Sequence, residues 1–158
     1  MKEIQLTQGK VALVDDEDFE WLNQWKWQAC LYRKAWYVAR TTSRIPRVHI
    51  FMHREIMKAP DELNVDHIDR NGLNCQKHNL RLCTETQNHA NTGLQKNNAS
   101  GYKGVYFVKK DNKWHAKIDC EYRRYHLGDY NNPEDAARAY DRKARELFGE
   151  FAVTNFQQ

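Results

Sequence analysis

The sequence has little that would cross-link a small protein or anchor it in a membrane. Only four of its 158 residues are cysteine, and no two of them form a Cys-x-x-Cys pair, which argues against a zinc knuckle or a disulfide framework. No apolar run approaches the roughly 20 residues that span a bilayer, and residues 1–5 lack the apolar stretch of a signal peptide. We therefore expect a cytoplasmic protein with reduced, packed thiols. A zinc site of mixed cysteine and histidine ligands, with His78 or His89 contributing, is the alternative.

Neither sign of charge dominates, because the net charge is only +4. The charge is unevenly distributed, however: residues 1–60 carry a net +3, residues 61–92 a net −2 and residues 93–158 a net +3. This pattern predicts that the two basic segments bind a polyanionic partner. The acidic segment between them would repel phosphate unless a cation were bound there. The pattern favours a metal-dependent enzyme acting on nucleic acid, although so small a net charge also arises by chance.

The first segment, residues 1–47, alternates short apolar runs with turns and is rich in aromatic side chains. We expect strands over residues 10–14, 26–31 and 35–40, a helix over residues 16–25, and a hairpin turn at Tyr32-Arg33-Lys34. Four of the five tryptophans lie here. They could stack on bases, but large aromatic side chains dominate small cores, so core packing is the favoured interpretation.

The middle segment combines short strands with polar side chains suited to catalysis. A strand over residues 48–51 is expected to lead into a helix, with His49 and His53 as structural or DNA-facing residues and not as ligands. A strand around Asp66-His67, a turn-rich loop, a strand over residues 78–82 and a helix that begins after Thr84 are expected to follow.

Phosphodiester hydrolysis needs a base that takes a proton from water and a cation that stabilises the phosphate. The ordinary pKa of histidine, near 6.5, suits His67 to act as a general base at neutral pH. Asp66 offers a carboxylate oxygen and Asn88 an amide oxygen, which a hard cation such as magnesium accepts. Neighbouring side chains on a strand diverge, so Asp66 could bind the metal while His67 faces the attacking water.

The polar residues 93–100 predict a linker. Beyond them, alternation over residues 104–127 predicts a three-stranded antiparallel meander, and Asn132, Pro133 and Gly149 mark the ends of a helix that covers its apolar face, with Trp114 beneath. The other face is basic and aromatic, and could enter a DNA major groove or bind RNA. The side chains expected on it are Lys103, Tyr106, His115, Lys117, Arg124 and His126.

Three stretches of the middle segment resemble the His-Asn-His (HNH) endonucleases of phages and mobile introns. They are Asp66-His67-Ile68-Asp69-Arg70-Asn71, His78-Asn79-Leu80-Arg81-Leu82 and Gln87-Asn88, and the resemblance extends upstream to the stretch Met52-His53-Arg54-Glu55-Ile56-Met57. It implies a ββα-metal nuclease fold with His67 as the general base and Asn79 orienting His67 and shaping the loop. It also implies that Asp66 and Asn88 hold one divalent cation, magnesium or alternatively manganese. His89 is the alternative to Asn88, Arg81 either contacts phosphate or pairs structurally, and Cys75 is expected to be inert.

The last segment resembles the DNA-binding domain of plant ethylene-response transcription factors of the Apetala-two type. The stretches that carry the resemblance are Tyr102-Lys103-Gly104-Val105, Lys113-Trp114-His115-Ala116-Lys117-Ile118, His126-Leu127-Gly128, residues 133–141 and Asn155-Phe156. It implies a sheet in the major groove with contacts from Lys103, Tyr106, Lys117, Arg124 and His126. The family usually has Arg at the first two of these positions and Trp at the last, so the base preference is expected to differ.

The sequence thus predicts an α+β protein in four parts: a strand-rich segment (1–47), an HNH nuclease domain (48–92), a linker (93–100) and an ethylene-response-type domain (101–158). We expect a phage-like, metal-dependent DNA endonuclease that acts in a bacterial host cell as a monomer or homodimer. Double-stranded DNA is the expected partner, and no small-molecule cofactor is expected. The alternative is a non-cleaving, sequence-specific DNA-binding regulator whose middle domain is a scaffold.

Overall fold

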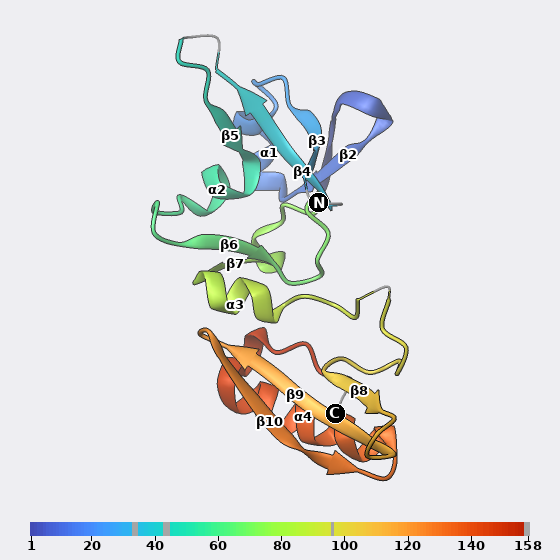
Figure 1. Ribbon diagram of the computed structural model, residues 1–158. Coiled ribbons are helices and arrows are strands. Elements are labelled where there is room, and N and C mark those ends of the chain that lie inside the picture. Colours follow the sequence, from blue (N-terminus) through green and yellow to red (C-terminus); the bar gives the residue numbers. More distant parts are fainter. Residues whose placement is uncertain (33–34, 43–44, 96, 157–158) are drawn as a thin grey trace. The chain divides into compact units, whose positions relative to one another are not determined.

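The computed structural model of the protein (Figure 1) describes residues 1–32, 35–42, 45–95 and 97–156. Its chain divides into two units, Met1–Glu85 and Thr86–Gln158. Arg33 and Lys34 of the predicted hairpin turn lie outside the described residues, as does Lys96 of the predicted linker. No helix within the described ranges is long and apolar enough to cross a membrane.

The first unit contains three small antiparallel sheets. Its elements, in chain order, are β1 (Lys2–Gln5), η1 (Thr7–Gly9), β2 (Val11–Val14), α1 (Asp16–Leu22), β3 (Gln28–Tyr32), β4 (Ala35–Thr41), β5 (His49–Phe51), α2 (Met52–Met57), β6 (Asn64–His67), η2 (Lys77–Asn79) and β7 (Leu80–Cys83). The sheets pair β1 with β2, β3 with β4 and β5, and β6 with β7. The strands and helices predicted for this part of the chain are therefore present, within a few residues of their expected ends.

Two features of the first unit differ from the expectation. Strand β1 was not predicted, because its four residues contain a single apolar side chain, Ile4, and one buried residue gives no alternation. Helix α1 ends at Leu22, three residues early, and Trp25 is 49% exposed instead of lying on the helix face. Trp27 packs into the core where Trp25 was expected. It is fully buried and donates its indole N–H to the carbonyl of Leu22 over 2.8 Å.

A single hydrophobic core connects the strand-rich segment to the middle segment. Ile4, Val14 and Val38 come from residues 1–47, and Met52 and Val65 come from the stretch beyond. Backbone hydrogen bonds follow the same path, since Leu13 of β2 donates to the carbonyl of Leu73 and accepts from the amide of Cys75. Described residues on both sides of the predicted boundary at residue 47 consequently share this core.

The loop between β6 and β7 lies tightly against β4, and Gly72 makes this approach possible. A Cβ atom at Gly72 would lie 2.2 Å from the carbonyl oxygen of Trp36 and 2.8 Å from Cδ1 of Tyr37. Any larger side chain would push this loop away from the strand, because Cβ atoms do not approach other heavy atoms so closely.

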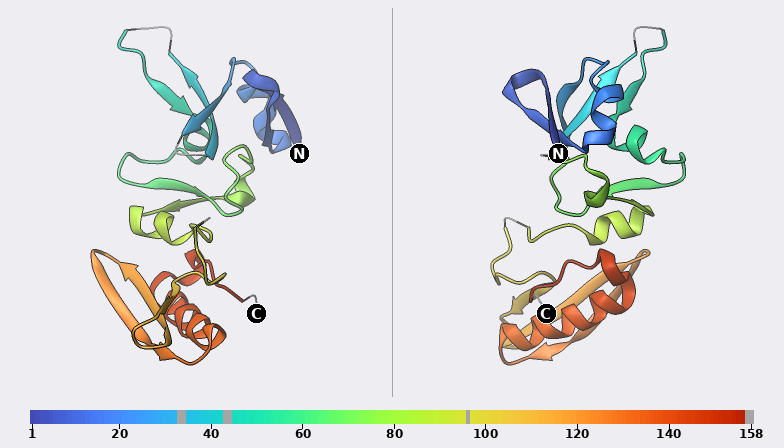
Figure 2. Two further views of the ribbon diagram at one scale, coloured as in Figure 1. Left: turned by 45° about the vertical axis from the view of Figure 1, so that its right-hand side comes forward. Right: turned by 180° about the vertical axis from the view of Figure 1, so that it is seen from behind.

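The second unit contains one antiparallel sheet covered by one helix, as the sequence predicts. Helix α3 (Glu85–Ala90) spans the division between the units. The elements beyond it are β8 (Val105–Val108), β9 (Lys113–Cys120), β10 (Arg123–Tyr130), α4 (Pro133–Phe148) and η3 (Gly149–Phe151), with the strands in the order β10-β9-β8. Figure 2 shows α4 running along one face of this sheet.

Small residues let α4 lie close on the sheet. Ala116 of β9 and Ala136 and Ala137 of α4 are fully buried in the second core, and Trp114 packs against this core as predicted. The helix begins at the expected cap, where the Asn132 side chain accepts a hydrogen bond from the backbone N–H of Asp135 over 2.8 Å.

Gly104 provides a test of the packing between sheet and helix. It has φ of +75°, and a Cβ atom there would lie 2.0 Å from the ring of Tyr140. Gly101 has φ of +77° with nothing within 4 Å of a Cβ atom. We expect Gly104→Ala to lower the free energy of unfolding by about 1–3 kcal/mol more than Gly101→Ala, since both add backbone strain but only the first adds overpacking. Urea unfolding of the full chain, followed through the NMR indole signal of Trp114, measures this difference, and equal losses would contradict it.

Candidate functional site

The hairpin of β6 and β7 positions two of the three residues predicted to act in the first unit. Asp66 and His67 are the last residues of β6, where Asp66 lies opposite Arg81 and His67 opposite Leu80. Each of the two side chains is only 5% exposed. Both were predicted from the sequence, and the structure places them next to each other in a largely buried position.

Asp66 is engaged by the guanidinium group of Arg81. Nε of Arg81 donates to Oδ2 of Asp66 over 2.9 Å, and Nη2 lies 2.8 Å from the same oxygen. A buried carboxylate needs such a countercharge. Of the two alternatives for Arg81, the structure shows the structural pairing. A cation bound to Asp66 would share the carboxylate with Arg81.

The imidazole of His67 lies among other rings. Its centroid is 6.0 Å from that of Tyr37 and 4.9 Å from that of His53, with both pairs in edge-to-face orientation. Burial lowers the pKa of His67 below its ordinary value, while the carboxylates of Asp69 and Asp66 oppose this effect. The ring is therefore neutral at neutral pH, which is the form that can accept a proton.

His53 lies next to this site, and its contact with His67 is what sequence reasoning missed. It was expected to be structural or DNA-facing, and its burial agrees with the structural alternative: α2 directs it into the interior, where it is 8% exposed and contacts the rings of His67, Tyr37 and Phe51. Burial, then the neighbouring His67 and Arg54, lower its pKa to about 3. Its Nδ1 atom is buried without a hydrogen bond from the described residues. One sequence signal could have indicated that His53 lies near the site: it belongs to the upstream stretch that resembles the HNH endonucleases.

Asn79 shapes the loop that follows His67. Its side-chain oxygen accepts from the backbone N–H of Asp69 over 3.0 Å, and its amide nitrogen donates to Oδ1 of Asp69 and to the carbonyl of Asn74, each over 2.9 Å. Its carbonyl accepts from the N–H of Ile68 over 2.9 Å. These bonds fix the backbone immediately after His67, which agrees with the loop-shaping part of the predicted role.

Asp69 contributes to the same loop from its other side. It accepts hydrogen bonds from the backbone N–H of Asn71 and the side chain of Asn74, both over 2.8 Å. Partial burial opposes ionisation of Asp69, but these bonds and the one from Asn79 outweigh it and lower its pKa. The carboxylate therefore stays charged and keeps the loop closed.

The predicted third position lies on α3, in the second unit. Asn88 is half-buried there and His89 is exposed. The structure brings Asp66, His67 and Asn79 together in the first unit, and the joint role of Asp66 and Asn88 stays a prediction.

All four cysteines are free thiols. Cys75 is fully buried, and burial raises its pKa to about 12. Such a thiol is protonated at neutral pH, which agrees with the expectation that Cys75 is inert.

In the second unit, the sheet face away from α4 gathers most of the residues predicted to contact DNA. Tyr106 lies opposite His115, and Lys117 lies opposite His126. The ring of His115 is 5.6 Å from that of Tyr106 and 5.4 Å from that of His126, and Nζ of Lys117 lies 4.9 Å from the centre of the Tyr106 ring. These side chains form a continuous aromatic and basic surface.

The two remaining residues predicted to contact DNA have other partners. Arg124 shares this face and donates from Nε to Asp119 over 2.7 Å, but both side chains are largely exposed, so the pair is weak. Lys103 precedes β8, and its ammonium group donates to the carbonyls of Ala90 and Thr92 over 2.8 and 2.6 Å. Binding of Lys103 to DNA would require it to leave these carbonyls.

Comparison with known proteins identifies both parts of the chain. Residues 58–90 match the HNH endonuclease family model, and residues 100–150 match the AP2 domain model. The chain is 32% identical over 149 residues, 93% of its own length and 75% of the relative's, to a protein of Acanthamoeba polyphaga mimivirus named as an uncharacterized HNH endonuclease. The chain belongs to the HNH endonuclease family.

Other relatives of this HNH endonuclease family member match shorter stretches of it. Protein 3.8 of Escherichia phage T7 is 36% identical over 93 residues, 59% of this chain and 76% of the phage protein. An AP2/ERF and B3 domain-containing transcription repressor of Arabidopsis thaliana is 37% identical over 73 residues, 46% of this chain and 20% of the repressor. The predicted combination of an HNH endonuclease domain with a C-terminal AP2 DNA-binding domain is thus confirmed, and both domains imply DNA as the partner.

The buried His53 predicts a dependence of stability on pH. Because its pKa is about 3 in the folded protein against 6.5 ordinarily, the unfolded chain binds a proton between these values that the folded chain does not. Stability should therefore fall as the pH drops below 6.5, by about 1 kcal/mol per pH unit from this residue. Urea unfolding in EDTA between pH 7 and pH 5 should show a shallower slope for His53→Gln. His49→Gln, which replaces an exposed imidazole, should keep the original slope, and equal slopes in all three proteins would contradict the prediction.

Proposed function

We propose that the protein is a metal-dependent DNA endonuclease that hydrolyses phosphodiester bonds, with His67 as the general base and the AP2 domain providing affinity for the site. One observation carries the proposal: the neutral imidazole of His67 and the carboxylate of Asp66 end the same strand, directly before a loop that Asn79 holds in shape. Family membership supplies the reaction class, which is DNA hydrolysis by an endonuclease. HNH nucleases typically use a divalent metal ion for it.

In this proposal His67 takes a proton from the water that attacks phosphorus. The O–H bond of the water breaks, a new P–O bond forms, and the bond from phosphorus to the leaving sugar oxygen breaks. The rings of Tyr37 and His53 hold the imidazole in one orientation, and their apolar surroundings keep it neutral. A preoriented neutral base raises the rate by making the proton transfer concerted with attack.

The donor atoms suit a hard divalent cation. Asp66 provides carboxylate oxygens and Asn88 an amide oxygen, and magnesium prefers oxygen ligands and takes only one or two from a protein. We propose that these residues hold magnesium, or manganese in its place. A cation bound there would stabilise negative charge on the phosphate. Arg81, already on Asp66, would keep that carboxylate oriented.

The AP2 domain would hold DNA through the sheet face that carries Tyr106, His115, Lys117, Arg124 and His126. Lys117 and Arg124 would neutralise phosphates or contact base edges, and the adjacent rings would pack against the sugars and bases. Because Lys103 is bound to backbone carbonyls, we give it a secondary role in this surface.

A non-cleaving DNA-binding regulator is the second candidate. Two observations favour it: Arg81 already compensates the charge of Asp66, and one relative of the AP2 part is named as a transcription repressor. The two candidates make opposite predictions for one assay, the cleavage of plasmid DNA in the presence of magnesium.

Replacement of His67 should abolish most of the cleavage without affecting binding. We expect His67→Ala to slow magnesium-dependent cleavage of plasmid DNA by roughly 100- to 10,000-fold, the usual contribution of a general base. His78→Ala, which removes an exposed imidazole from the same hairpin, is the matched control and should cut at the normal rate. Gel-shift affinity in EDTA should be the same for all three proteins.

The same assay can contradict the proposal at separate points. Normal cleavage by His67→Ala would exclude this residue as the base, and absence of cleavage by the unaltered protein under all divalent ions would favour the regulator. Asn88→Ala and His89→Ala distinguish the alternatives for the third position, since only removal of the true ligand should raise the magnesium concentration needed for half-maximal rate. The ratio of nicked to linear plasmid reports whether one strand or both are cut.

Replacement of a basic residue on the sheet face should weaken DNA binding and not the chemical step. We expect Lys117→Ala and Arg124→Ala each to reduce affinity. Where the replaced side chain neutralises a phosphate, the slope of log affinity against log salt should fall by about one unit. Lys143→Ala, on α4 behind the sheet, is the matched control for removal of one positive charge. Unchanged affinity and slope in both sheet variants would place the DNA-binding surface elsewhere.

A further inference from the structure

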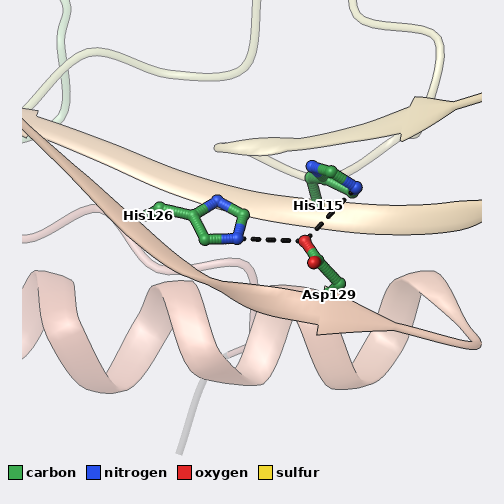
Figure 3. Close-up of side chains that lie close together, drawn as sticks. All are labelled: His115, His126 and Asp129. Atoms are coloured by element: carbon green, nitrogen blue, oxygen red, sulfur yellow. Dashed lines mark ion pairs between the residues drawn. The ribbon is translucent and has the colours of Figure 1, made fainter. Parts of the chain in front are cut away.

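Two histidines and one aspartate converge on the sheet face of the second unit. His115 lies on β9, and His126 and Asp129 lie on β10 (Figure 3). One side-chain ligand atom from each of the three lies within 4.8 Å of the others, and the cluster is the one group of this kind found in the part of the chain that the structure describes. Its members come from two neighbouring strands of a hydrogen-bonded sheet, so the backbone holds them in place.

An irregularity in β10 creates this cluster. Residues three apart on a regular strand point to opposite faces, which would separate His126 from Asp129. The register shifts between His126 and Gly128, so that His126 pairs with Lys117 while Asp129 pairs with His115. The extra residue restores Asp129 to the outer face. Gly128, with φ of +119°, permits this conformation.

The spacing of the ligand atoms is close to what a tetrahedral ion requires. Oδ1 of Asp129 is 3.2 Å from Nε2 of His115 and 3.0 Å from Nε2 of His126. Two ligand atoms at the usual zinc distances lie about 3.3 Å apart. Oδ2 of Asp111 lies 3.4 Å from Nε2 of His115 and offers a second carboxylate.

Nε2 of His115 has a further property expected of a ligand atom. It is buried and has no hydrogen bond within the described ranges, although the two carboxylates are near. A buried polar atom without a hydrogen bond costs free energy, and coordination of an ion by this nitrogen would remove the cost.

We propose that His115, His126 and Asp129 bind a divalent transition-metal ion of the zinc type, with Asp111 or water completing the coordination. Two imidazole nitrogens favour zinc over magnesium, which prefers an all-oxygen shell. The site contains no cysteine and lies apart in sequence from the nuclease residues. It is therefore a second metal site, independent of whether Asp66 binds a cation.

Binding of a metal ion at this site would change the sheet face that is proposed to bind DNA. A bound divalent ion raises the charge of the sheet face by two and fixes both imidazoles in one orientation. A phosphate oxygen could then occupy an open coordination position. The affinity of the AP2 domain for a polyanion would in this way respond to the zinc concentration.

The test is a zinc titration of the whole 158-residue chain in millimolar magnesium, which keeps hard-cation sites occupied. Calorimetry gives the affinity, and long-range ¹H–¹⁵N spectra identify the imidazole nitrogens that bind the ion. We expect zinc to shift Nε2 of His115 and His126, and His126→Gln and Asp129→Asn each to weaken zinc binding by more than about 10-fold. Asp119→Asn, an exposed carboxylate on the same face, is the matched control and should bind zinc normally.

Either of two results would overturn the proposal. One is the absence of a zinc-dependent shift at both nitrogens, which would leave the cluster as a set of imidazole–carboxylate ion pairs only. The other is equal zinc affinity in Asp129→Asn and Asp119→Asn. An unchanged Trp114 indole signal in each variant verifies that the sheet is folded. Because the measurements need no DNA, they stand even if the proposed cleavage activity is wrong.

Discussion

The hydrogen bonds of Asn79 hold in place the loop on which the whole first unit depends. Through Asp69 and the carbonyl of Asn74 they fix the chain immediately after His67. The same loop then pairs with Leu13 of β2 and lies directly against β4 at Gly72. A single amide side chain thus links the end of the strand that carries His67 to two other sheets. Hydrogen bonds of this kind are worth most where water is excluded.

The strand-rich segment is part of the candidate nuclease site and not an accessory to it. Tyr37 of β4, in the strand-rich segment, lies against the ring of His67. Phe51 of β5, in the middle segment, extends the same group of rings through His53. These side chains supply the dry surroundings that lower the pKa values of both imidazoles. The burial that lowers the pKa of the proposed base therefore comes partly from residues outside 58–90, the stretch that matches the HNH endonuclease model, while Asp66 and Asp69 within that stretch oppose the shift.

The sequence allowed much of the fold to be predicted, because strong local signals mark it. The alternation in β8 and β9 and the Asn132–Pro133 start of α4 are such signals, and both were interpreted correctly. Interactions between distant segments left no comparable signal: nothing local shows that His53 turns inward, or that Asp66 meets Arg81. The bulge near Gly128 was also missed, because one additional residue in a strand changes which side chains face outward without changing composition.

The shared core of residues 1–85 has a consequence for how such proteins could be rearranged in evolution. A recombination event that moved only the hairpin and its loop would separate Val65 and Leu80 from Ile4, Val14 and Trp27, the partners that shield them from water. The HNH part would therefore keep this core only if it were inherited together with the first strands. The AP2 domain has its own core, so it could be exchanged for another DNA-binding domain without disrupting the core of residues 1–85.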